Sequence, residues 1–121
     1  MKKVEGIGGV FFRAKNPAGL SQWYENHPGV NIAPTDEVMT PWNSKEGVTV
    51  FAPFKQDTDY FPAQNQFMVN FRVRDLDAML TQLRAADIAI THEESMEGVG
   101  RFARIHDPEG NLIELWQPSE E

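Results

Sequence analysis

The chain has 121 residues, of which 40% are apolar, and a formal net charge of −7. This length suits one compact domain, and the eight Phe and three Trp can supply a packed core. The absence of cysteine excludes disulfides, thiolate metal sites and cysteine nucleophiles, and the negative charge argues against nucleic acid as a partner. No apolar run approaches the roughly 20 residues that span a bilayer and no signal peptide is evident, so we expect a cytoplasmic protein without a membrane partner.

The first half of the chain predicts a strand, a helix and further strands. Asn16 is a typical N-cap residue and Pro17 suits the first helical position, where its missing N–H costs nothing. Leu20 and Tyr24 lie at helical spacing on one face, and Gly29 follows the end of this helix. Strands are predicted at residues 9–14 and 47–52, with weaker patterns at 30–33 and 38–42.

The second half predicts the same order of elements after a polar linker at residues 54–66. Asp75 caps a helix that fades near Asp87. Residues 107–111, with the sequence DPEGN, predict a hairpin turn because Pro presets φ and Gly supplies the positive φ that the turn needs. Strands are predicted at residues 67–73, 101–106 and 112–117, with a weaker pattern at 88–91 and a loop from His92.

The two halves are related by a repeat with an offset of 59 residues. Residues 12–16 (FRAKN) and 71–75 (FRVRD) are identical or chemically alike at each position, and the apolar register continues into both helices. We therefore predict an α+β fold in one domain over residues 1–121. It consists of two tandem βαβββ modules, at about 4–53 and 67–118, which form a curved mixed sheet with the helices outside and a concave cup inside.

Alternation along the predicted strands sorts side chains onto two faces of the sheet. The uniformly apolar sets should lie beneath the helices, while the other sets mix polar and aromatic residues and should line the cup. A merely solvent-exposed face is the alternative, but Phe11 and Trp116 on one face favour a pocket. This mixed face is predicted to carry Phe11, Arg13, Phe51, Met68, Asn70, Arg72, Phe102, Arg104, His106, Glu114 and Trp116, with Trp42 nearby.

The segment at residues 100–116, GRFARIHDPEGNLIELW, resembles the closing hairpin of glyoxalase, bleomycin-resistance and extradiol dioxygenase-like proteins of the vicinal oxygen chelate superfamily. Residues 69–77 resemble the start of the second module in that group, and residues 9–14 resemble its first strand. The resemblance implies the cup fold, a small-molecule ligand and a homodimer. Metal-using members place ligands at positions matching Gly9, Phe51, Met68 and Glu114. Only Glu114 can coordinate a hard cation, so no cofactor is expected and a metal at Glu114 is the alternative.

Two functions are open at this point, beside a third option of a domain that serves only subunit association through its exposed sheet edges. In the first, the protein is a glyoxalase-like lyase or isomerase, in which Glu114 acts as general acid or base. Arginines of the mixed face would then hold an anionic or carbonyl-containing substrate, and Asn70 would orient it. In the second, the protein binds a small molecule without changing it, as resistance or sequestration proteins do. The aromatic residues would then supply stacking surface, and Glu114 would form an ion pair with an arginine.

Overall fold

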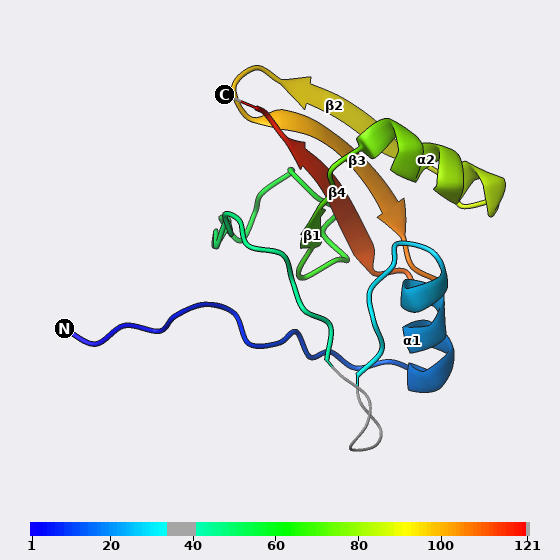
Figure 1. Cartoon of the computed structure of the whole chain (residues 1–121), viewed down its shortest axis with the longest axis horizontal. Helices are drawn as coiled ribbons and strands as arrows, with labels where there is room; N and C mark the ends of the chain where they lie inside the picture. Colours follow the sequence, from blue (N-terminus) through cyan, green and yellow to red (C-terminus); the bar gives the residue numbers. More distant parts are fainter. Residues whose placement is uncertain (34–40, 121) are drawn as a thin grey trace.

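The protein, seen in a computed structural model that describes residues 1–33 and 41–120, has two helices and one four-stranded sheet in these ranges (Figure 1). The sheet has the strand order β1-β4-β3-β2, in which β1 is parallel to β4 and the other pairs are antiparallel. The α+β class and the mixed sheet are therefore confirmed. Neither helix of the described ranges is long and apolar enough to cross a bilayer. The elements are α1 Pro17–Asn26, β1 Val69–Arg72, α2 Leu76–Ala85, β2 His92–Met96, β3 Gly100–His106 and β4 Leu112–Pro118.

Both helices begin at the residues that the sequence predicts. The Asn16 side-chain oxygen accepts a hydrogen bond from the Gly19 N–H at 3.0 Å, and the Asp75 carboxylate accepts one from the Ala78 N–H at 3.0 Å. Each cap satisfies a backbone donor that has no partner within its helix. The two helices are ten residues long and start 59 residues apart, which is the offset of the sequence repeat.

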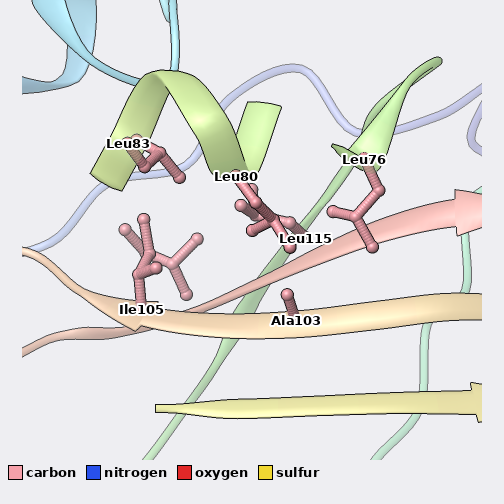
Figure 2. Close-up of a cluster of buried hydrophobic side chains, with 7 residues drawn as sticks. Leu76, Leu80, Leu83, Ala103, Ile105 and Leu115 are labelled. Carbon is pink, nitrogen blue, oxygen red and sulfur yellow. The ribbon is translucent and has the colours of Figure 1, made fainter. Parts of the chain in front are cut away.

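The core lies between α2 and one face of the sheet, as Figure 2 shows for leucines of α2 above residues of β3 and β4. Leu76, Leu80 and Leu83 are almost fully buried, so α2 is fixed by its apolar side. The alternation expected for β3 and β4 is confirmed, since the sheet residues of the core cluster are those assigned to the helix side. They are Ala103, Ile105, Ile113 and Leu115, with Trp23, Tyr24, Phe71, Val73, Met79, Ile88 and Ile90 packed around them.

The position of the edge strand β2 differs from the prediction of a strand at residues 88–91. Residues 88–91 form no strand, and β2 instead comprises His92–Met96, a stretch in which a loop was expected. It pairs antiparallel with β3, from His92 opposite Arg104 to Met96 opposite Gly100. Its polar composition hides it from a hydrophobicity pattern, but charged side chains suit a strand whose outer edge faces water.

The strands predicted for the first half of the chain are also absent from the described residues. Residues 9–14, 30–33 and 47–52 form no strand in the single chain, and the 38–42 prediction falls largely outside the described residues. The stretch before α1 runs away from the body of the protein (Figure 1), and Phe11 and Phe51 are 94% and 84% exposed. A strand needs a neighbour for its backbone groups, and the four-stranded sheet draws every strand from the second half.

The 107–111 hairpin holds α1 against the sheet module. Asp107 is buried, and one of its carboxylate oxygens accepts the backbone N–H groups of Glu109 and Asn111. The other oxygen accepts the Asn111 side chain at 2.7 Å and the Tyr24 hydroxyl at 2.7 Å. Burial, together with the Asp107 charge, raises the pKa of Tyr24, so this phenol remains a hydrogen-bond donor at neutral pH.

The same hairpin also binds the start of α1. The Glu109 carboxylate accepts the backbone N–H of Lys15 at 2.6 Å and that of Asn16 at 3.0 Å. An acidic side chain at this end also interacts favourably with the helix dipole. Because the turn contacts both the start and the last turn of α1, it fixes the position of this helix.

We predict that Tyr24→Phe lowers the free energy of unfolding by about 1–2 kcal/mol, because a hydrogen bond to a buried carboxylate is lost. Chemical denaturation of the wild type and the variant measures the change. Gln22→Ala, on the exposed side of the same helix, is the control and should change stability by less than about 0.5 kcal/mol. Equal effects of the two substitutions would contradict the anchoring role of Tyr24.

Candidate functional site

Strand register brings polar side chains from three strands into one row. Asn70 of β1 lies opposite Glu114 of β4, and Glu114 lies opposite Arg104 of β3. Cross-strand partners point to the same side of a sheet, so these residues share the face away from α2. Two positions further along β4, Trp116 lies opposite Phe102. We keep the name mixed face for the sheet surface formed by Asn70, Phe102, Arg104, Glu114 and Trp116.

Glu114 is the centre of this row. It is 4% exposed, and both carboxylate oxygens have donors. Its Oε1 accepts the Asn70 side-chain N–H at 2.9 Å, while its Oε2 accepts Arg104 Nε–H at 3.3 Å and the Tyr60 hydroxyl at 3.2 Å. A buried carboxylate is costly unless it is paired and hydrogen-bonded, and here both conditions are met.

Tyr60 is a site residue that sequence reasoning missed. It belongs to the 54–66 linker, and its ring lies 4.6 Å from the Arg104 guanidinium carbon, a distance typical of a cation–π contact. Phe54 packs on the same ring at 5.3 Å between centroids. Burial, reinforced by the Glu114 charge, raises the pKa of Tyr60. The available signal was the trio of Phe54, Tyr60 and Phe61 in an otherwise polar linker.

Phe102 and Trp116 form an aromatic surface beside the polar row. Their rings are parallel within 3° at a centroid distance of 6.0 Å, which is an offset stack. The Trp116 indole N–H donates to the Val99 carbonyl at 3.0 Å, so the ring orientation is fixed. Gly100, with φ of +137°, allows this close approach because an added Cβ would clash with the Gln117 carbonyl.

Three other residues predicted for the site, Arg72, Met68 and His106, make no hydrogen bond to Glu114. Arg72 shares the register of the mixed face but donates to the backbone carbonyls of Lys45 at 2.8 Å and Glu46 at 3.5 Å. The half-buried Met68 directly precedes β1, and His106 is exposed at the end of β3.

Four predicted residues from the first half do not join the mixed face in the single chain. Phe11, Arg13 and Phe51 are exposed on segments that pair with no strand. Trp42 packs with its ring 6.0 Å from Phe71, a residue of the opposite, helix-covered face. The reason is the same for all four, since side-chain alternation places a residue on a sheet face only where its strand is paired.

The residues around Glu114 do not fit a divalent metal. In residues 1–33 and 41–120, no group of three or more His, Cys, Asp or Glu side chains is placed to bind one. Gly9, Phe51 and Met68 offer no suitable ligand, and the Arg104 guanidinium bonded to Glu114 would repel a cation.

A hollow in the protein surface lies away from Glu114. A hollow of about 590 Å³ lies at the β2–β3 turn and the end of β4, lined by residues 95–97, 100–101 and 117–120. Its lining includes Arg101, which pairs with the exposed Asp77 at 2.8 Å, but it excludes Glu114. The space above Glu114 is instead occupied by Tyr60.

Comparison with known proteins matches the chain to one family model and to several solved structures. A family model described as a glyoxalase-like domain matches residues 9–116, whereas the chain has no match among curated proteins. Among solved structures, TnmS3, an antibiotic binding protein from Streptomyces sp. CB03234, is 25% identical over 87% of this chain and 88% of that chain, with a TM-score of 0.56. Lactoylglutathione lyase from Agrobacterium tumefaciens shares the fold, with a TM-score of 0.64, 17% identity and 96% coverage of both chains.

We predict that Arg104→Met lowers the free energy of unfolding by about 3–5 kcal/mol, because it leaves Glu114 buried without its cation. Thermal and chemical unfolding measure the effect. The double variant Arg104→Met/Glu114→Leu should recover most of the loss, since it removes both charges.

The control for this prediction is Arg84→Met. Arg84 pairs with Glu93 at 3.1 Å, but both side chains are more than half exposed, so the loss should stay below about 1 kcal/mol. A double variant as unstable as Arg104→Met would show that the buried pair is not the cause.

Proposed function

Because the chain belongs to the glyoxalase-like domain family, we propose that it binds a small aromatic molecule on its mixed face and releases it unchanged. The observation that carries this proposal is the state of Glu114, whose two oxygens already accept three hydrogen bonds. A general base must lie within hydrogen-bond reach of the substrate proton, yet Glu114 is 4% exposed and three of its roughly four acceptor positions are occupied. Glu114 is therefore better suited to recognising a ligand than to abstracting a proton.

The aromatic pair supports a planar ligand. Trp116 lies beside Glu114 with its ring stacked on the buried Phe102 and held by its indole hydrogen bond, which favours stacking of a ligand at low entropic cost. The likeness to TnmS3, described as an antibiotic binding protein, also supports binding rather than turnover.

We predict that a panel of naphthalenes bearing a hydroxyl, carboxylate or amide group contains at least one compound with saturable binding, measured by ligand-observed NMR. Trp116→Ala should weaken that binding at least about tenfold, because it removes the more exposed ring of the stacked pair. Trp42→Ala, on the opposite side of the sheet, is the control and should change affinity less than about twofold.

Mass spectrometry of the recovered compound then separates binding from turnover. Unchanged compound is the expected result. Conversion that disappears in Glu114→Gln would contradict the proposal and favour a lyase or isomerase, and failure of the whole panel to bind would contradict small-aromatic binding itself.

We also propose that the binding unit is a homodimer. Residues 9–14 resemble residues 68–73, which include β1, at the 59-residue offset, yet they form no strand within the described residues, and their Phe11 is almost fully exposed. Exposed, strand-forming apolar segments and the open edge at β1 favour pairing with a second copy. The partner would then supply further residues to the mixed face.

We predict that the wild type sediments as a dimer in analytical ultracentrifugation and that Phe11→Ser/Phe51→Ser weakens the dimer at least about tenfold. Met96→Ser, at an exposed position of β2, is the control and should leave the dimer intact. A monomeric wild type, or an equal effect of the control, would contradict this assembly.

A further inference from the structure

We call the surface over Glu114 and Arg104 the corner, and one side chain from outside the sheet, Tyr60, contacts both residues there. Tyr60 donates its hydroxyl proton to Glu114 Oε2 and lays its ring against the Arg104 guanidinium. A phenol ring thus makes two contacts at once, a hydrogen bond to a buried carboxylate and a cation–π contact with the paired cation.

The two hydrogen bonds at Glu114 Oε2 are longer than the one at Oε1. The Tyr60 and Arg104 donors lie at 3.2 and 3.3 Å, whereas charge-assisted bonds of these types are typically about 2.5–2.7 and 2.7–2.9 Å. Asn70 holds Oε1 at 2.9 Å. A better-placed O–H donor at Oε2 would therefore find an acceptor that Tyr60 uses only weakly.

The linker can release Tyr60 without unpairing the sheet. The Tyr60 backbone N–H donates to the Thr58 hydroxyl, within the linker itself, and Thr58 closes a turn back to Lys55. The linker has a separate attachment at Asn65, whose side chain donates to the Gly110 carbonyl at 3.1 Å. The side chain of Tyr60 can thus leave Glu114 while the rest of the fold stays in place.

We propose that Tyr60 is an internal stand-in for the ligand and that the ligand is a hydroxylated aromatic compound, a phenol or naphthol, which displaces it. The inference rests on the proposed function and specifies its ligand class. The ligand hydroxyl donates to Glu114 Oε2, and the ligand ring covers Arg104.

The chemistry of the corner excludes the neighbouring ligand classes. A carboxylate here would face the Glu114 carboxylate, an aromatic ether has no proton to donate, and an aliphatic alcohol has no π face for Arg104. The Phe102–Trp116 row lies two residues further along the strands, roughly 7 Å away. A fused bicyclic phenol can therefore reach both features.

Isothermal titration calorimetry with 2-naphthol and its methyl ether, 2-methoxynaphthalene, tests the inference on the full chain. Tyr60→Ala should bind 2-naphthol at least tenfold more tightly than the wild type, because the internal competitor is gone. The ether should gain less than threefold. Tyr60→Phe, which keeps the ring and loses only the hydroxyl, should show an intermediate gain and guards against a misfolded alanine variant.

Two further variants complete the experiment. Phe61→Ala removes a neighbouring linker aromatic that makes no hydrogen bond to Glu114, and it should leave naphthol affinity within twofold of the wild type. Tyr60→Ala/Glu114→Leu should lose the preference for naphthol over the ether.

Equal naphthol affinity of the wild type and both Tyr60 variants would overturn the inference, as would an equal gain for the ether. Absence of naphthol binding to any variant would also overturn it. The proposed function would survive each of these results if another compound of the naphthalene panel bound in a Trp116-dependent way, so the two failures are distinguishable.

Discussion

The buried ion pair between Arg104 and Glu114 is the constraint on which the mixed face depends. A carboxylate with 5% of its side chain exposed is held within the sheet only while donors surround it, and Arg104, Asn70 and Tyr60 come from three separate parts of the chain. The pair links β3 to β4 on this face, while the donors Asn70 and Tyr60 link Glu114 to β1 and to the linker. The apolar core on the other face needs no such specificity, because leucines of α2 only have to bury area.

The buried pair of Arg104 and Glu114 bears on both the stability of the sheet and the proposed ligand binding. Paired buried charges contribute little net stability compared with apolar residues of similar volume, so the pair at the centre of this small sheet is available for the recognition role proposed above. In the proposed binding mode, Tyr60 hydrogen-bonds the buried carboxylate until a ligand takes the same acceptor oxygen. The 107–111 hairpin adds a rigid frame, because Asp107 and Glu109 fix the position of α1.

Local signals in the sequence predict both helix starts and most of the second half of the fold well. The caps at Asn16 and Asp75, the DPEGN turn and the alternation in β3 and β4 depend on neighbouring residues, and each has the expected structure. The strand predictions at 9–14 and 47–52 are wrong in the single chain. A strand forms only beside a neighbouring strand, and a local sequence pattern does not say whether that neighbour is present. Asn70, Arg104 and Glu114 could be placed on one face from periodicity, whereas Tyr60 follows no periodicity and reaches Glu114 only through the path of the linker.

The most direct measurement of the central claim is NMR of wild-type side-chain and amide signals during titration with 2-naphthol. The account predicts saturable shifts of the Arg104 Nε–H, the Asn70 side-chain amide and the Tyr60 backbone amide, because the ligand enters at Glu114 and moves Tyr60 away. The Arg84 Nε–H, in an exposed ion pair, should stay unchanged. Shifts confined to residues 95–101, around the hollow at the β2–β3 turn, with no change at Arg104, would contradict the account.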